Sequence, residues 1–224
     1  LFVLFLNFLK VAMRPSPIPV IAALLLLSLS LIAQDDPRYQ LLLKSGSFIP
    51  QKNITADKLN QFNREAARTV GKTFALLQFE NIPTAAERNQ LMEAGIELLE
   101  YIPNNAYTVT ITGSLNTELL TQIKARAFVE LSAEQKMQPE LAKGTIPAWA
   151  VKVAGTIDVW ISFPKSFIYE TIAQELKNRN FDITSGLHKD YRIIALRVAT
   201  SRLSELASLP FIEYVQPIPH EDQS

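Results

Sequence analysis

The sequence predicts an α+β protein, and three observations carry this prediction. Hydrophobic residues make up 48% and charged residues 20% of the 224 residues, which is a globular composition. Short apolar runs alternate with stretches of helical periodicity, in the order strand, helix, strand, strand, helix, strand. The same order returns after roughly 84 residues, and a fixed spacing of this kind indicates an internal repeat.

The N-terminal residues 1–33 predict a secretory signal peptide. A charged start at Met13 precedes the apolar run Val20–Leu27 and a small residue, Ala33, at the expected cleavage point. The apolar stretch falls short of the roughly 20 residues of a membrane-spanning helix, so a retained anchor is the less favoured alternative. We interpret residues 1–12 as an upstream translation artefact. The expected localisation is secreted, periplasmic or cell-envelope in a bacterium, with membrane contact only through this peptide.

Residues 34–73 predict an N-terminal segment of one strand and one helix. The apolar run Tyr39–Leu43 reads as a short strand, and Gly46 marks the turn that follows it. Apolar residues at helical spacing predict a helix over Ala56–Val70, with Thr55 as its N-cap.

Residues 74–141 predict the first repeat unit. Thr84 and Glu87 have the spacing of a capping box, and Gly95 stands where a left-handed helix C-cap is needed. Asn116 is suited to cap the second helix. The four expected strands are Phe74–Phe79, Ile96–Ile102, Tyr107–Thr112 and Phe128–Leu131.

A linker rich in small residues and proline, 142–156, leads to a second unit at 157–219 and a tail at 220–224. Asn180 takes the place of Gly95, and asparagine is the second choice for a left-handed cap. The expected elements are a strand Val159–Phe163, a helix opened by Pro164 with the stripe Ile168, Ile172, Ala173 and Leu176, strands Phe181–Leu187 and Tyr191–Val198, a helix with Leu203 and Leu206, and a last strand Phe211–Glu213.

The repeated order predicts two tandem ferredoxin-like βαββαβ units. In such a unit both helices cover one face of a four-stranded antiparallel sheet, because each crossover returns to the same side. The other face is expected to stay open in both units. Units of this size bury only about 60% of their unfolded surface, so a partner on the open face would add stability.

The amino-acid composition excludes most familiar catalytic, metal-binding and phosphate-binding sites. Without the leader the chain carries a formal charge of −2, which gives no reason to expect nucleic acid as a partner. There is no Cys and there are only two His, and neither a metal-ligand spacing nor a phosphate loop is present. We therefore expect no catalytic, cofactor-binding or metal-binding residues.

Individual residues that could carry chemistry have plainer interpretations. His188 is read as a solvated turn residue and His220 as an exposed tail residue. Four carboxylates, Glu97, Glu100, Glu130 and Glu213, are read as outward-facing strand residues. Trp149 is read as packing of the linker and Trp160 as strand core. None of these readings requires a site.

The stretch Gly95–Tyr107, with the pattern Gly-Ile-x-Leu-Leu-x-Tyr-Ile-Pro-x-x-Ala-Tyr, resembles the N-terminal propeptide region of secreted bacterial subtilisin-like serine peptidases. The resemblance begins near Leu77. Two later segments, Leu131–Pro139 and Tyr214–Pro217, resemble closing strands of propeptide units in that family. Altogether it covers most of residues 39–219.

The resemblance implies a βαββαβ fold and a role as intramolecular chaperone and inhibitor of a subtilase domain, in cis or in trans. In the family the sheet face docks on two surface helices of the peptidase, and the segment after the last strand lies in the substrate cleft. The cleft residues would here be Gln216, Pro217, Ile218, Pro219 and His220.

The three motifs of the subtilase catalytic triad, Asp-Thr-Gly, His-Gly-Thr and Gly-Thr-Ser, are absent, so this chain is expected not to be an enzyme itself. It would be a fragment, a truncated product or a free-standing inhibitor. Which of the two units contacts the enzyme stays open, since simple subtilisins have one.

Two other functions remain as alternatives. One is an exported adhesion or binding module unrelated to proteolysis, and the other is a small-ligand sensor with the ligand between the two units. Only the prodomain hypothesis predicts that deleting Gln216–Ser224 abolishes protease inhibition while the fold stays intact.

Overall fold

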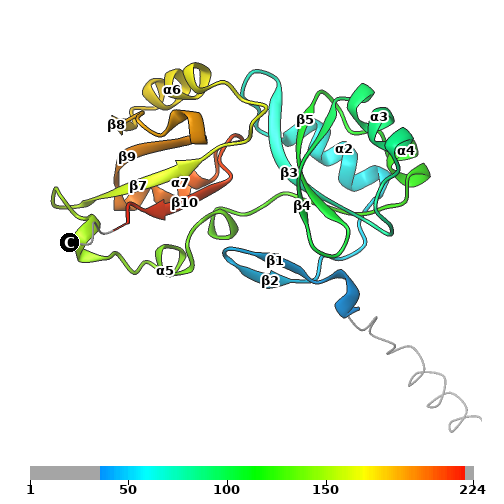
Figure 1. Ribbon diagram of the computed structural model, residues 1–224, viewed down its shortest axis with the longest axis horizontal. Coiled ribbons are helices and arrows are strands. Elements are labelled where there is room, and N and C mark those ends of the chain that lie inside the picture. Colours follow the sequence, from blue (N-terminus) through cyan, green and yellow to red (C-terminus); the bar gives the residue numbers. More distant parts are fainter. Residues whose placement is uncertain (1–35, 220–224) are drawn as a thin grey trace, which may run out of the picture. The chain divides into compact units, whose positions relative to one another are not determined.

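A computed structural model describes residues 36–219, and these residues form an α+β structure of three antiparallel sheets and flanking helices (Figure 1). The expected α+β class is thereby confirmed. The predicted leader, residues 1–33, and His220 with the rest of the tail lie outside the described residues.

The first half of the molecule, residues 36–130, contains a four-stranded sheet in the order β4-β5-β3-β6. All of its neighbouring strands are antiparallel. Its elements are β3 (Lys72–Phe79), α3 (Ala85–Glu93), β4 (Ile96–Ile102), β5 (Ala106–Thr112), α4 (Thr117–Gln122) and β6 (Ala125–Val129).

The second half, residues 156–219, contains a four-stranded antiparallel sheet in the order β10-β7-β9-β8. If the four strands of each sheet are numbered in chain order, both sheets have the spatial order 4-1-3-2, which is β6-β3-β5-β4 in the first sheet. The elements are β7 (Thr156–Ser162), α6 (Tyr169–Asn178), β8 (Asp182–Ser185), β9 (Ile193–Ala199), α7 (Leu203–Ala207) and β10 (Tyr214–Pro217).

The N-terminal segment packs onto the first half. A hairpin of β1 (Leu41–Leu43) and β2 (Gly46–Phe48) is followed by α2 (Ala56–Glu65), which begins at the expected cap Thr55 but ends five residues before Val70. Asn53 lies along the outer edge of β6, where its side chain both donates to the carbonyl and accepts from the amide of Phe128. Unpaired edge groups of β6 are satisfied in this way.

The connection, residues 131–155, contains the short helix α5 (Pro139–Ala142) and two 3-10 turns, at Glu134–Lys136 and Ala148–Ala150. Met137 forms a parallel bridge to Val215, and the amide of Gln138 donates to the Val215 carbonyl. These residues therefore lie along the outer edge of β10. None of the helices within residues 36–219 is long and apolar enough to cross a bilayer.

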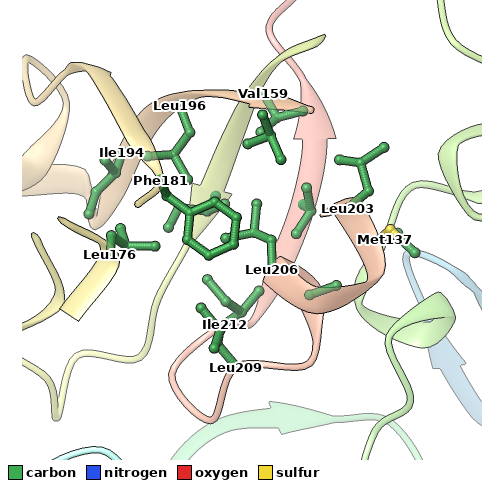
Figure 2. Packing of buried hydrophobic residues seen from close by; sticks show 14 of the residues in the cluster. Met137, Val159, Leu176, Phe181, Ile194, Leu196, Leu203, Leu206, Leu209 and Ile212 are labelled. Atoms are coloured by element: carbon green, nitrogen blue, oxygen red, sulfur yellow. The ribbon is translucent and has the colours of Figure 1, made fainter. Parts of the chain in front are cut away.

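Each half has its own hydrophobic core between its sheet and its helices. In the first half Leu59 and Phe62 of α2 join Leu91 of α3 and Leu120 of α4 against alternate residues of the strands. Figure 2 shows the core of the second half, where Phe181 lies among Leu176, Ile194 and Leu206. Period-two alternation along β5 and β9 points every second side chain into these cores.

Several local signals are confirmed. Thr84 and Glu87 form a reciprocal capping box at the start of α3. Gly95 and Asn180 both adopt positive φ values, +81° and 57°, after α3 and α6. A Cβ at Gly95 would meet the Thr112 carbonyl oxygen at 2.3 Å, so only glycine fits this close approach.

Other expectations are wrong in detail. The last strand is β10, Tyr214–Pro217, and Phe211–Glu213 precedes it in an irregular segment. Helix α6 begins at Tyr169, several residues after Pro164, and its expected stripe residue Ile168 is exposed. Proline at 164 therefore opens the turn before the helix. Met92 of α3 is also exposed.

Candidate docking face on the second sheet

The side of the second sheet opposite its hydrophobic core carries a set of mainly polar side chains. Along β7 the residues Ile157, Val159 and Ile161 belong to the core, so the alternating residues point the other way. We call this side the second-sheet face, and its central residues are Asp158, Trp160, Ser162, Ala195, Arg197 and Gln216.

Trp160 is at the centre of the second-sheet face. It pairs with Ala195 on one side and Gln216 on the other, and its indole is partly exposed. The His188 ring packs edge-on against it, with ring centroids 5.4 Å apart at 68°. The expectation that Trp160 lies in the strand core is therefore wrong. The expectation for His188 is also wrong in part, since its side chain is half-buried and not fully solvated in its turn.

Next to Trp160, Asp158 and Arg197 form a two-pronged ion pair. The guanidinium Nε and Nη2 of Arg197 donate to the two carboxylate oxygens of Asp158 at 2.7 and 2.8 Å. The hydrogen bond to Asp158 raises the pKa of Arg197, although partial burial opposes this. The planar fork fixes both side chains, so the second-sheet face presents a rigid polar surface.

Exposed apolar residues lie in the connection between β8 and β9, which also holds His188. Leu187 is 80% and Tyr191 77% exposed. Large apolar side chains at this exposure commonly belong to contact surfaces, particularly when they border a partly exposed aromatic residue. Of the residues in this loop, His188 contacts Trp160 on the second-sheet face.

The expected cleft residues are held by the second sheet. Gln216 and Pro217 are the last residues of β10 and pair with Trp160 and Val159. The amide of Ile218 donates to the Asp158 carbonyl at 3.1 Å, and its carbonyl accepts from Trp149 Nε1 at 3.3 Å. Pro219 is exposed, and His220 lies outside the described residues. A deletion starting at Gln216 would remove half of β10.

The corresponding side of the first sheet is closed, which corrects the expectation of an open face in both units. Leu41 of the β1–β2 hairpin packs on Leu76 and Ala106, and all three are fully buried. Gln78 on the same side donates to the carbonyls of Tyr39 and Asn104. We call this side the first-sheet face. The N-terminal segment covers this face because the residues in contact, Leu41 on the hairpin and Leu76 and Ala106 on the sheet, are apolar.

Two of the four glutamates named in the sequence analysis, Glu130 and Glu213, have different surroundings. Glu130 forms an exposed ion pair with Lys58 at 2.9 Å. Glu213, by contrast, is not an outward-facing strand residue: it is half-buried beside a small cavity, where burial and then repulsion from Glu100 raise its pKa to about 7. The sequence offered no signal for this, because the burial depends on contacts between the two halves.

Residues 36–219 contain no group of three or more His, Asp or Glu placed to hold a metal ion. The hydroxyl of Ser166 lies 2.5 Å from the hydroxyl of Thr110. Lys136 is 4% exposed, its ammonium donates to the Leu209 carbonyl, and burial lowers its pKa to about 8.

Comparison with known proteins gives one similarity. Residues 42–132 match the model of a family described only as a domain of unknown function, DUF8729. The matched range includes β2, α2 and all four strands of the first sheet. Neither a curated protein nor a solved structure matches the chain.

Proposed function

We propose that this chain is the non-catalytic prodomain of an exported subtilisin-like serine peptidase, which it assists in folding and inhibits. Each half is taken as a ferredoxin-like unit, since both sheets share one strand order. The Gly95–Tyr107 resemblance supplies the partner class.

The observation that carries the proposal is the difference between the two sheet faces. The first-sheet face is occupied by the β1–β2 hairpin, whereas the second-sheet face keeps Trp160, Arg197 and Gln216 partly exposed. This difference favours the second half as the one that contacts the peptidase. A partly exposed tryptophan within a rim of fixed polar groups has the character of an interface hot spot.

The position of β10 adds to this argument. Strand β10 belongs to the same sheet, and Ile218 is fixed by Asp158 and Trp149, so the chain leaves the second-sheet face at Pro219. A partner on this face would meet the departing segment at its edge. The cleft segment would then begin at Pro219, since Gln216 and Pro217 are already paired.

The test is inhibition kinetics with a subtilisin-type serine peptidase and the purified chain from residue 34 to 224. We expect slow-binding inhibition followed by degradation of the inhibitor. Trp160→Ala should weaken inhibition at least tenfold, as expected for loss of a hot-spot side chain. Tyr101→Ala removes a half-exposed aromatic residue from the first half and is the matched control.

A second variant separates the two contacts. Removing residues 219–224 leaves β10 complete, and it should abolish inhibition while binding through the second-sheet face remains measurable. Immediate cleavage of the intact chain without any inhibition, or equal inhibition by the Trp160→Ala variant and the intact chain, would contradict the proposal. In the first case a binding module unrelated to proteolysis would be favoured.

A further inference from the structure

One arginine of the first half is half-buried without a hydrogen-bond acceptor. Arg68 lies between α2 and β3, and its Nη1 is buried with no partner. The guanidinium lies over the Phe62 ring, 5.3 Å from the ring centroid, and this stacking fixes the group but leaves its N–H donors free. The other half-buried arginines within residues 36–219 each donate to at least one oxygen; they are Arg126, Arg192, Arg197 and Arg202.

The next residue, Thr69, has the same feature. It is 6% exposed, and its hydroxyl is buried with no partner. Its backbone is fixed, because its amide donates to the Lys72 carbonyl at 2.9 Å and its carbonyl accepts from the Lys72 amide at 3.0 Å. Buried polar groups without partners are uncommon in folded proteins. This short segment therefore holds a partly dehydrated cation that no protein anion compensates.

Arg68, Thr69 and Val70 line an open cavity of about 500 Å³, a size that is typical of small-molecule sites. Lys72 Nζ donates to the Ser166 carbonyl at 2.9 Å, which ties the start of β3 to the segment that leads into α6 (Figure 1). The rest of the cavity wall comes from α6. Its lining residues are Glu170, Thr171, Gln174, Glu175 and Asn178.

The two carboxylates of this wall differ in their partners. Glu175 accepts from Arg179 Nε at 2.8 Å, so its charge is already compensated. Glu170 is exposed and has no ion pair within residues 36–219. The uncompensated charges of the cavity are therefore the Arg68 guanidinium and the Glu170 carboxylate. A simple anion would be repelled by Glu170, and a simple cation by Arg68.

We propose that this cavity binds a small amino-carboxylate, a molecule that carries one carboxylate and one ammonium group. The ligand carboxylate accepts from Nε and Nη2 of Arg68, the same two nitrogens that Arg197 uses toward Asp158. The ligand ammonium donates to Glu170. Val70 is the one apolar residue of the lining, so the ligand is hydrophilic throughout.

This site does not depend on the proposed function. Helix α6 covers the core side of the second sheet, since its residues Ile172 and Leu176 pack in the second core with Val159. The cavity is therefore not on the second-sheet face, and a ligand in it leaves Trp160 accessible. Ligand binding and peptidase inhibition can be measured separately, and either can fail without the other.

The test is an NMR titration of the purified chain from residue 34 to 224, followed at the backbone amides. The probes are glycine, β-alanine, γ-aminobutyrate and ε-aminocaproate, in which the two charges are progressively further apart. We expect saturable shifts at Arg68, Thr69 and Thr171 for at least one of them, with a dissociation constant on the order of 1 mM. Acetate and methylammonium carry one charge each and should bind about tenfold more weakly.

Three variants assign the contacts. Arg68→Met should weaken the best probe about tenfold or more, as expected for loss of hydrogen bonds to a charged group. Arg64→Met is the matched control, since Arg64 is an exposed arginine of α2 outside the cavity lining. Glu170→Gln changes an exposed side chain and should leave the fold intact. It should abolish the preference for the amino-carboxylate over acetate.

Three results would overturn the proposal. The first is the absence of saturable shifts with all four amino-carboxylates. The second is binding of acetate to the unmodified chain as tightly as the best amino-carboxylate. The third is an unchanged preference in the Glu170→Gln variant, which remains decisive even if Arg68→Met does not fold.

Discussion

The two halves share one strand order but use the outer faces of their sheets differently. Leu76 on the first-sheet face pairs with Thr108 and Val129 and is fully buried under the β1–β2 hairpin. Trp160 occupies the same strand position on the second-sheet face and stays partly exposed. A shared topology therefore does not decide whether a face becomes core or surface.

What decides it is the chemistry of a few neighbouring residues. Around Leu76 the face packs against Leu41 of the hairpin, and the Gln78 side chain is hydrogen-bonded within the covered layer to the carbonyls of Tyr39 and Asn104 and to Arg126. Around Trp160 the face carries the Asp158–Arg197 pair, which a covering hairpin would have to dehydrate. The first face is suited to permanent burial and the second to contacts that form and dissociate.

The largest expected effect is on stability at the matched strand positions. Leu76→Ala leaves a cavity in a fully buried layer and should lower the free energy of unfolding by about 2–4 kcal/mol. Trp160→Ala removes a partly exposed side chain and should cost about 1 kcal/mol or less. Urea denaturation of both variants measures the difference. Equal losses would show that the second-sheet face is a structural layer like the first.

An intermediate effect is expected at Lys136, where the halves meet. Lys136→Met keeps the shape but removes a buried charge, and the Leu209 carbonyl still accepts from the Ile212 amide. We expect a gain of about 1 kcal/mol near pH 6, as for other buried charges replaced by apolar residues of similar size.

The pH dependence checks the cause of that gain. Since burial lowers the pKa of Lys136 from 10.5 to about 8, the folded chain binds fewer protons in this range, and wild-type stability should rise with pH across it. The Met variant should lack this rise. Lys143→Met, at an exposed lysine of the same connection, should change neither value. A loss of stability with Lys136→Met would show that its hydrogen bond outweighs its dehydration.

The smallest effect concerns the helices that cover the two sheets. Helix α3 has a capping box at its start, whereas the N-cap position of α6 is Ile168, which has extended backbone angles, 67% exposure and no side-chain cap. Ile168→Asp should stabilise the second half by about 0.5–1 kcal/mol. Ile168→Ala supplies no acceptor and should give no such gain in thermal unfolding. If both variants behave alike, capping is not what distinguishes the two helices.

Local signals predicted much of the fold. Caps at Thr55, Thr84 and Asn116, the left-handed residues Gly95 and Asn180 and the alternation along β5 all depend on near neighbours, and the structure has each of them. The position of the last strand was missed because Phe211 and Ile212 are apolar for a different reason: they fill the second core from an irregular segment. An apolar run alone does not distinguish these cases.

The sequence predicts the surroundings of the candidate sites less well than it predicts the helices and strands. Periodicity assigns Trp160 to a strand but does not say which of its two sides will be covered. Burial of Glu213 and Lys136 requires elements that are distant along the chain, such as β4 with the start of β10, to be placed together. The closed first-sheet face depends likewise on a hairpin whose sequence carries no mark of its docking place.

The backbone bond from Phe74 to Pro210 has a consequence for how the two halves can be separated. Strand β6 pairs with β3 only from Leu76 onward, so the buried Phe74 amide depends on the second half for its acceptor. A first half produced alone would lose that acceptor, and the amide would have to bond to water instead. A chain in which the second half was exchanged would keep this hydrogen bond only if the new half brought a carbonyl to the same place.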